Sequence, residues 1–208
     1  MKIIEPSFVF EDELDPRAIM SKIERAGRTC YKSEGRIGDG TAEKFIASIV
    51  SRGHESVLEH ASVTARLICD RGVTHEIVRH RIAAYSQEST RYCNYSGDKF
   101  GSEITVIRPF FWNDDPEKFA VWREAMEAAE KAYNALIAMG ATPQEARSVL
   151  PNSLKTELVM TMDLREWRHF LKLRTSPAAH PQMREIALPI LKEFKKQLPV
   201  LFSDIEAE

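Results

Sequence analysis

The sequence predicts an α+β fold in a single domain spanning residues 1–208, with a mixed or antiparallel sheet flanked by long helices. Three observations favour this class. Short segments alternate apolar and polar residues, longer segments carry apolar residues at helical spacing, and the two kinds intermix without a repeat or linker. With 208 residues, 43% of them hydrophobic, the chain can bury one substantial core.

Four segments have the pattern of strands. In the clearest of them, Val63, Ala65 and Leu67 fall on one face, which is typical of a half-buried strand. Pro6 cannot donate a backbone hydrogen bond, so it limits pairing in the first segment. The polar residues 83–96 are expected to form a loop. The expected strands are residues 2–10, 62–69, 103–108 and 156–162.

Several segments are predicted to be helical. Thr41 is expected to cap one of them, Asp115 with Pro116 suits the start of a long one, and Pro189 is expected to kink the last. We expect helices at residues 14–31 and 73–82, and others beginning near residues 41, 116, 142, 163 and 181. The tail, residues 203–208, is expected to be frayed.

Apolar stripes indicate which helical faces are buried. Trp122, Met126 and Tyr133 lie at a spacing typical of a core or a subunit interface. In the helix expected after Asp163, the apolar residues are predicted to face inward and the polar ones outward. The inward set is Trp167, Phe170 and Leu171, and the outward set is Arg165, His169 and Lys172.

Composition and charge exclude several classes of protein. The formal net charge of −2 argues against a general nucleic-acid-binding protein, which is usually strongly basic. The N-terminus lacks the long apolar region of a signal peptide, and no apolar stretch approaches the roughly 20 residues of a membrane span. The three cysteines are far apart and odd in number, so we expect a cytoplasmic protein without a disulfide framework.

Residues 71–92 contain the strongest functional signal. This stretch holds four arginines and two histidines among hydroxyl and amide side chains, and glycine is nearly absent from it. Such a composition suits an anion site built from side chains, because the guanidinium group can bind phosphate through two parallel hydrogen bonds. The sequence also lacks the Gly-rich phosphate loops of the common nucleotide-binding folds.

Two other functions are compatible with parts of this stretch. One is a nucleic-acid-binding module, against which the near-neutral charge and the interspersed Asp70, Glu76 and Glu88 count. The other is a metal-dependent hydrolase built on His54, His60, His75 and His80. His75 and His80 are five residues apart, which on the expected helix separates them by about 140° and excludes HExxH chemistry. On that helix, Arg79 would lie under His75 and His80 under Glu76. No metal site is therefore predicted.

The order of residues in the stretch matches a known motif. Arg79, His80 and Arg81 are followed after seven residues by Ser89, which is the RHRX7S pattern. The chain thereby resembles the flavin-dependent thymidylate synthases. Four other segments between residues 29 and 190 match family motifs, in the order in which the family has them. These are His54-Glu55-Ser56 followed by Glu59-His60, Ser89 followed by Arg91-Tyr92, Glu145-Ala146-Arg147 followed by Leu150-Pro151, and Phe170 followed by Leu173-Arg174.

The resemblance implies a flavoprotein that binds FAD in a homotetramer whose active sites are shared between subunits. Such an enzyme reduces its flavin with NADPH and moves a methylene group from methylenetetrahydrofolate to dUMP. The products are dTMP and tetrahydrofolate, so the reaction belongs to de novo dTMP biosynthesis and combines methyltransferase with oxidoreductase chemistry. The expected partners are these small molecules and further copies of the chain, not nucleic acid or a membrane.

The resemblance also implies roles for individual residues. FAD contacts are implied for Ser56, Arg79, His80, Arg81, Gln87, Asp163, Arg165 and His169. dUMP contacts are implied for Glu76, Arg79, Gln87, Glu88, Ser89, Thr90, Arg91, Arg147 and Arg174. In the family, the arginine at the place of Arg174 polarises the uracil and promotes ionisation at N3, so Arg174 is the expected catalytic residue. Arginine suits this role because it is a cation that does not titrate.

Some positions depart from the family's usual pattern. Members often carry asparagine where Asp163 stands, and asparagine or histidine where His169 stands, and the segment around Gln87 also varies. A carboxylate accepts hydrogen bonds but cannot donate one as an amide does. Ser89 is interpreted as a hydrogen-bond donor to phosphate, because the spacing shows no histidine to activate it as a nucleophile. Cys93 is the other candidate nucleophile.

Overall fold

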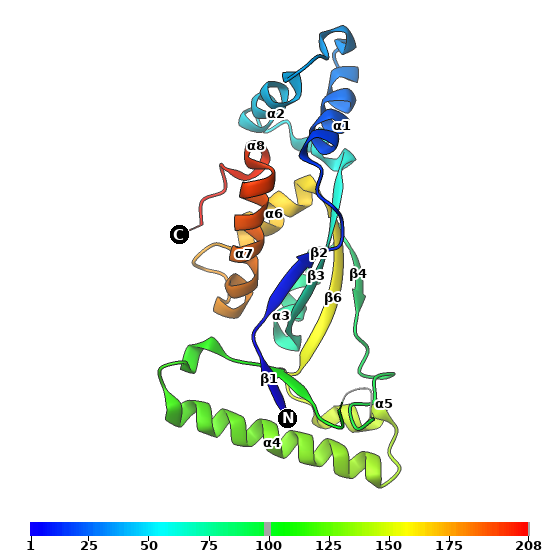
Figure 1. Cartoon of the computed structure of the whole chain (residues 1–208), viewed down its shortest axis with the longest axis vertical. Coiled ribbons are helices and arrows are strands. Elements are labelled where there is room, and N and C mark those ends of the chain that lie inside the picture. Colours follow the sequence, from blue (N-terminus) through cyan, green and yellow to red (C-terminus); the bar gives the residue numbers. More distant parts are fainter. Residues whose placement is uncertain (98–100, 208) are drawn as a thin grey trace. The chain divides into compact units, whose positions relative to one another are not determined.

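The computed structural model describes residues 1–97 and 101–207 and shows strands and helices intermixed along the chain (Figure 1), which confirms the predicted α+β class. The strands are β1 (Lys2–Ile4), β2 (Ser7–Phe10), β3 (Ser62–Asp70), β4 (Ala84–Gln87), β5 (Thr105–Ile107) and β6 (Lys155–Asp163). The α-helices are α1 (Pro16–Thr29), α2 (Thr41–Ser51), α3 (Arg71–Ile77), α4 (Pro116–Ala138), α5 (Pro143–Ala146), α6 (Leu164–Arg174), α7 (Pro181–Gln197) and α8 (Pro199–Phe202). The 3-10 helices are η1 (Glu34–Arg36), η2 (Glu55–His60), η4 (Phe110–Trp112) and η5 (Arg147–Val149).

The chain forms two compact units. The first comprises residues 1–7, 67–79 and 86–158, and the second comprises residues 8–66, 80–85 and 159–208. The strand order in the larger sheet is β2-β3-β6-β4. In the first unit, β1 pairs in parallel with β5, while Val106 and Leu154 form an antiparallel bridge, so pairing of both senses occurs.

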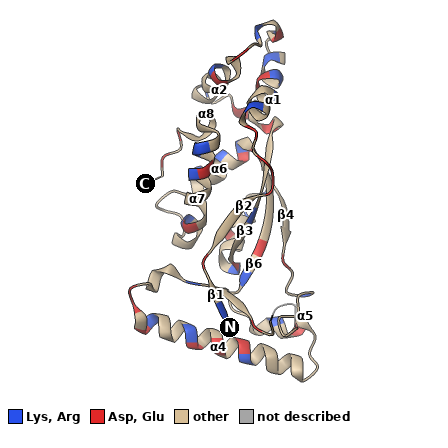
Figure 2. Cartoon of the chain, viewed as in Figure 1, with Lys and Arg blue, Asp and Glu red and all other residues tan. Residues whose placement is uncertain are grey.

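The core of the first unit forms along α4. Trp122, Met126 and Tyr133 are buried there with Val106 and Leu154, so the predicted apolar stripe is core. The exposed side of the same helix carries Lys, Arg and Glu in mixed order (Figure 2). The helix begins where predicted, because Asp115 accepts a hydrogen bond from the backbone of Lys118.

The core of the second unit contains a cluster of aromatic rings. Trp167 on α6 lies 5.2 Å from Phe194 on α7, whose ring stacks on Phe202 at 4.4 Å between centroids. The indole of Trp167 also donates a hydrogen bond to the carbonyl of Val63, which ties α6 to β3. The predicted inward set of α6 is confirmed as fully buried, and the predicted outward set is exposed. Across residues 1–97 and 101–207, no helix has both the length and the apolar content needed to cross a membrane.

Several local predictions were wrong. The segment 2–10 is two strands, interrupted at Glu5 and Pro6, and the expected loop 83–96 contains strand β4. The helix expected at 73–82 ends at Ile77, so Arg79 and His80 do not lie one turn below His75 and Glu76. The N-cap of α2 is Gly40, not Thr41, and Gly40 adopts the left-handed conformation.

The tail prediction was also wrong for its described part. Phe202 and Ile205 are buried, and Asp204 forms an ion pair with Arg168. Glu208 lies outside the described residues. The sequence pattern gave no sign of this anchoring, because the partner of Asp204 lies 36 residues earlier in the chain.

Helices α1 and α2 approach each other closely at Gly27, and adding a methyl group there is expected to destabilise the protein. A Cβ atom at this position would lie 2.5 Å from the Cζ atom of Phe45. We therefore expect Gly27→Ala to lower the unfolding free energy by about 1–3 kcal/mol, the usual cost of overpacking. Urea denaturation measures this. Gly35→Ala is the control, because no atom would lie within 4 Å of its new Cβ.

The double variant with Phe45→Leu tests the cause. Shortening the side chain at 45 is expected to recover part of the loss in Gly27→Ala, because it removes the clash. Equal stability of Gly27→Ala and Gly35→Ala would contradict the proposed close packing.

Candidate active site

The second unit contains a hydrogen-bonded chain of ionisable side chains centred on His80. Its Nδ1 atom lies 3.2 Å from Oε1 of Glu166, and its Nε2 atom accepts a hydrogen bond of 3.0 Å from Nε of Arg174. Glu166 and Arg174 lie near opposite ends of α6. The hydrogen bonds therefore link the carboxylate of Glu166, through the imidazole of His80, to the guanidinium of Arg174 at the C-terminal end of α6.

The contact with Arg174 fixes the tautomer of His80. The Nε–H group of arginine can only donate, so Nε2 of His80 must present its lone pair and the ring proton must be on Nδ1. That proton is then donated to Glu166. His80 is consequently neutral and joins a negative group to a positive one.

The surroundings of His80 favour this neutral form. The residue is only 5% exposed, and burial followed by the charges of Arg174 and His169 lowers its pKa to about 4. Burial also raises the pKa of Glu166. The imidazole packs 4.9 Å from the Phe170 ring, and the hydroxyl of Tyr85 donates to the His80 carbonyl at 2.6 Å. The imidazole is therefore held in one orientation.

Acidification is expected to destabilise the fold through His80. Its pKa is about 4 in the native state and about 6.5 in the unfolded state, so the unfolded state binds the proton first. The stability contributed by neutral His80 is complete above pH 6.5 and is lost as the pH falls towards 4, by up to about 3 kcal/mol for this group alone. Urea denaturation at several pH values measures the loss.

Glu166 acts in the opposite direction, because a raised native pKa adds stability as the carboxylate becomes protonated. We therefore expect Glu166→Gln to lose stability more steeply than the wild type between pH 6.5 and 4. Over the same pH range, His80→Asn should lose less unfolding free energy than the wild type. An unchanged slope in His80→Asn would show that other groups cause the acid sensitivity.

A metal ion is a poor fit to this cluster. His80, Glu166 and His169 offer ligand atoms within 4.8 Å of one another. However, both nitrogens of His80 hold hydrogen bonds, and the guanidinium of Arg174 would repel a divalent cation. Of the four histidines in the hydrolase hypothesis, only His80 belongs to this cluster among the described residues.

A cavity of about 510 Å³ lies beside the cluster, within the second unit. It brings together Asp163, Arg165 and His169, the three residues expected to form one flavin-binding patch. Arg165 is ion-paired with Glu59, and Asp163 caps α6 by accepting from the backbone of Glu166 at 2.8 Å. The remaining lining residues are Glu55, Glu59, Ile82 and Glu166. A wall with so many carboxylates suits hydroxyl and N–H donors better than phosphate.

The first unit positions the expected dUMP-binding segment. Gln87, at the end of β4, donates to the hydroxyls of Thr74 at 3.1 Å and Thr156 at 3.3 Å. Glu88 follows, and its backbone N–H donates to the Glu157 carbonyl. These bonds attach the segment to α3 and β6, so the backbone position at which the next turn begins is restrained.

Both carboxylate oxygens of Glu88 accept a hydrogen bond within the first unit. Lys155 donates to one of its oxygens at 2.8 Å and the hydroxyl of Tyr95 donates to the other at 2.7 Å. Burial lowers the pKa of Lys155, but the hydrogen bonds to Glu157 and Glu88 outweigh it, so the pKa is raised overall. The carboxylate of Glu88 therefore acts within the protein to hold the segment in place.

Beyond Glu88 the chain presents hydroxyls and arginines. The Oγ atom of Ser89 accepts from the backbone of Arg91 at 3.3 Å, and Arg147 approaches the hydroxyl of buried Thr90 at 3.5 Å. Arg91 and Arg147 are themselves exposed. The turn supplies two hydroxyls and one cation, and η5 supplies the second cation, so together they provide the donors that a phosphate group requires.

The expected site residues thus fall in both units. The first unit contains Glu76, Arg79, Gln87, Glu88, Ser89, Thr90, Arg91 and Arg147, and the second contains Ser56, His80, Arg81, Asp163, Arg165, His169 and Arg174. Arg79 and Arg81 are exposed on either side of buried His80. Sequence reasoning missed Glu166, Lys155, Tyr95, Thr74 and Thr156. Glu166 lies three residues after an N-cap aspartate, a spacing that indicates only a helix start.

The fold and these clusters define an α+β protein whose hydroxyl and guanidinium side chains can bind an anionic group. A family model described as thymidylate synthase complementing protein matches residues 17–200, and the chain belongs to that family. The flavin-dependent thymidylate synthase of Geobacter sulfurreducens is 36% identical over 197 residues, which cover 91% of this chain and 82% of that protein. The enzyme of the same name from Pyrococcus furiosus is 37% identical over 172 residues, which cover 82% of this chain and 70% of that protein.

A solved structure supports the fold assignment. The UMP/dUMP methylase PolB from Streptomyces cacaoi, solved with 5-Br dUMP bound, superposes with a TM-score of 0.80. The match covers 98% of this chain and 96% of that chain at 23% sequence identity. At this identity the similarity establishes the α+β fold and nothing further.

Proposed function

We propose that the protein is a flavin-dependent thymidylate synthase that converts dUMP to dTMP. Methylenetetrahydrofolate would donate the carbon, NADPH would reduce the bound FAD, and tetrahydrofolate would be released. Membership of the family and the similarity to two synthases at 36% and 37% identity support this activity. The structural observation that carries it is the hydrogen bond from Arg174 to His80, which fixes the one arginine expected to act on the pyrimidine.

We infer that the cavity beside α6 holds part of FAD. Its carboxylates from Glu59, Asp163 and Glu166 can accept hydrogen bonds from ribityl or ribose hydroxyls and from ring N–H groups. Phosphates do not fit this acidic wall, so we assign the pyrophosphate to the exposed arginines Arg79 and Arg81. Ser56 and Gln87 complete the proposed FAD contacts. When bound, FAD supplies the redox chemistry that no side chain can provide.

The turn after β4 is proposed to hold dUMP. Ser89, Thr90, Arg91 and Arg147 would bind the phosphate, because they present hydroxyl and guanidinium donors together. Gln87, whose amide is fixed by two threonine hydroxyls, would orient the nucleotide. The further dUMP contacts that we propose are Glu76, Arg79 and Glu88.

Arg174 is proposed to polarise the uracil. A guanidinium remains protonated throughout, so it can stabilise negative charge that develops on the ring as N3 ionises. His80 accepts the Nε–H of Arg174 at Nε2, and its Nδ1 proton is donated to Glu166, so both contacts favour the same tautomer. The protein therefore supplies orientation and a fixed positive charge.

The assembly proposed for the enzyme is a homotetramer that shares active sites between subunits. One subunit has a mass of 23.7 kDa, so light scattering should give about four times this value. Mixing inactive Arg147→Ala and Arg174→Ala subunits tests the sharing. Recovery of activity in the mixture would support shared sites, and a monomeric mass would contradict the assembly.

The activity itself is tested first by visible absorption. The protein is mixed with FAD, freed of excess flavin, and measured before and after addition of dUMP. We expect a retained flavin band that shifts with dUMP, and dTMP formation when NADPH and methylenetetrahydrofolate are added anaerobically. No flavin retained with or without dUMP would overturn the proposal.

A further inference from the structure

A second cavity in the second unit is strongly basic and has no role in the site described so far. It measures about 440 Å³ and lies between the end of α1, the turn after it, and α2. Four of its lining residues can carry positive charge, and none is acidic. Its cationic and aromatic lining residues are Arg28, Tyr31, Arg36, Phe45, Arg52 and His54. We call this group the basic cavity.

Two of the three arginines in the basic cavity are free to bind a ligand. Arg28 is not, because it donates twice to Glu24 and stacks 4.6 Å from the centre of the Phe45 ring. Within residues 1–97 and 101–207, neither Arg36 nor Arg52 has an ion pair, and both are exposed. Cations gathered without carboxylates repel one another, and an anion would relieve that repulsion.

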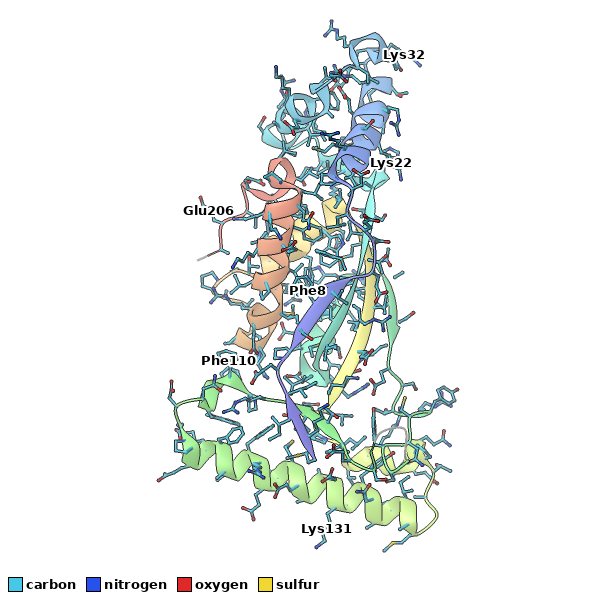
Figure 3. The ribbon with its side chains drawn as sticks, in the orientation of Figure 1. Phe8, Lys22, Lys32, Phe110, Lys131 and Glu206 are labelled. Atoms are coloured by element: carbon cyan, nitrogen blue, oxygen red, sulfur yellow. The ribbon has the colours of Figure 1, made fainter. Side chains whose placement is uncertain are left out.

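The chain around the basic cavity also presents an aromatic ring. Tyr31 is 67% exposed and shares the cavity lining with Phe45. The next residue, Lys32, lies in the turn after α1 (Figure 3) and adopts a left-handed conformation with φ of 47°. This conformation is uncommon for a residue other than glycine and costs free energy. An exposed ring beside a strained turn suits stacking on a flat group of a ligand.

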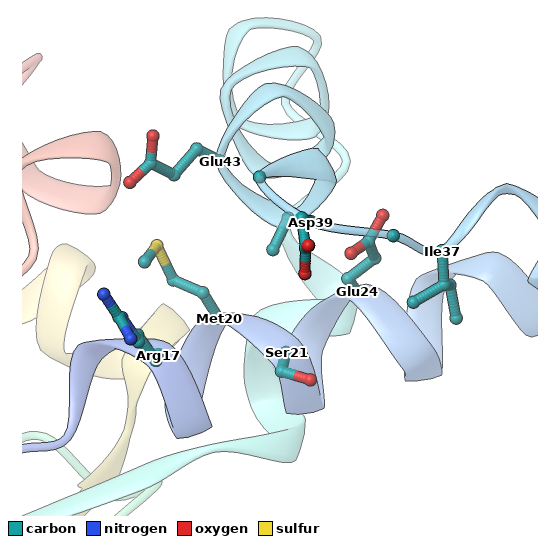
Figure 4. Close-up of a pocket in the computed structure, with 10 residues that line it drawn as sticks. Arg17, Met20, Ser21, Glu24, Ile37, Asp39 and Glu43 are labelled. Atoms are coloured by element: carbon teal, nitrogen blue, oxygen red, sulfur yellow. The ribbon is translucent and has the colours of Figure 1, made fainter.

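A neighbouring cavity on the same two helices shows that the positive charge is local. It measures about 560 Å³ and is lined by Glu24, Asp39 and Glu43, with Arg17 at one end (Figure 4). Glu24 is not available there, since Arg28 and the Thr41 hydroxyl occupy its oxygens. An anion would therefore be repelled from this acidic cavity and attracted to the basic one.

We propose that the basic cavity binds the anionic end of an extended co-substrate that also carries an aromatic or heterocyclic ring. The inference rests on the proposed synthase function, which requires two such molecules. The anionic groups are either the glutamyl carboxylates of methylenetetrahydrofolate or the phosphates of NADPH. Arg36 and Arg52 bind these groups, His54 lies beside them, and Tyr31 stacks on the ring. None of these residues takes part in the chemical step.

Steady-state kinetics distinguish the two sources. The variant Arg36→Gln/Arg52→Gln is compared with Arg17→Gln, which removes an exposed arginine from the acidic cavity instead. We expect the double variant to raise one KM by about tenfold for each arginine lost, with kcat within about twofold, since a charge-assisted hydrogen bond contributes about that much. Arg17→Gln should leave both KM values unchanged.

The substrate whose KM rises identifies the ligand. If carboxylates bind, the wild type prefers pentaglutamylated over monoglutamylated methylenetetrahydrofolate, and the double variant loses that preference. If a phosphate binds, the preference for NADPH over NADH falls instead. Unchanged preferences for both substrates in the double variant would overturn the proposal.

Calorimetry of the full-length protein separates this inference from the proposed function. Folic acid pentaglutamate and NADP⁺ are titrated into the wild type and the double variant, which requires no turnover. Tighter binding of one ligand by the wild type supports the basic cavity even if no dTMP is formed, in which case only the synthase function fails. If the double variant binds each ligand as tightly as the wild type does, the proposed role of the basic cavity is wrong, even if the protein is an active synthase.

Discussion

Replacing Arg174 with alanine is expected to lower kcat for dTMP formation by about 100- to 1000-fold, the usual loss when one fixed group that stabilises developing charge is removed. The side chain is only partly buried at the C-terminal end of α6, so the fold should persist. Steady-state kinetics measure the loss, and a thermal melt by circular dichroism checks the fold. Near-normal turnover would remove Arg174 from the mechanism.

Arg174→Lys separates charge from geometry. Lysine keeps the positive charge but cannot reproduce an Nε–H directed at His80 together with a planar fork. We expect its kcat to remain well below that of the wild type. Lys172→Gln provides the matched control, because it removes an exposed cation two residues earlier on α6. That variant should retain wild-type kcat.

The long helices were predictable because their apolar spacing encodes burial directly. The inward set of α6, including Trp167 and Phe170, follows from spacing alone, and every member is fully buried. The same holds for Val63, Ala65 and Leu67 on β3. In these elements one face carries nearly all the apolar side chains, so no distant contact is needed to choose the buried face.

The end of α3 was not predictable in this way. The residues after Ile77 are compatible with a continued helix, yet the chain leaves the helix and buries His80. The partners that stabilise His80 are Glu166 and Arg174, which lie 86 and 94 residues further along the chain. Tertiary contacts of this kind override local helix propensity. Strand β4 was missed for a similar reason, since its residues AYSQ lack the alternating apolar pattern of a strand and have a strand partner only in the folded sheet.

The motif order indicated which residues matter but not what holds them. Arg174 and His80 both follow from the resemblance, whereas their direct hydrogen bond does not. Glu166 belongs to neither the motif nor an apolar stripe. Its pairing with His80 depends on α6 presenting residues 166 and 174 to the same imidazole. Such a chain of contacts is a property of the folded unit.

Replacing Arg168 with methionine is expected to cost about 3 kcal/mol of unfolding free energy. Arg168 is only 1% exposed, donates to Glu55 at 3.0 Å and binds Asp204 through two bonds of 2.7 Å. Its Nη1 also donates to the carbonyl of Leu201. Removing one partner of a buried ion pair costs about 3–5 kcal/mol. We take the lower end because Asp204 is partly exposed and can be rehydrated.

The expected loss corresponds to a fall in Tm of about 6–12 °C for a chain of this size. Lys172→Met is the matched control, because Lys172 lies 3.8 Å from the same two carboxylates but is exposed. Its loss should stay within about 0.5 kcal/mol. If the two variants melt at the same temperature, the buried network does not stabilise the tail.

Arg168→Met should also disturb the wall of the cavity beside α6, because Glu55 is both an ion-pair partner of Arg168 and a lining residue of that cavity. Without Arg168, Glu55 loses its buried partner and η2 loses a direct tie to α6. We therefore expect weaker FAD retention at a temperature where the variant is still folded, measured by the flavin band after gel filtration. Asp204→Asn keeps Arg168 paired with Glu55, so it should lower Tm while retaining FAD. Equal retention by both variants would show that the network acts on stability alone.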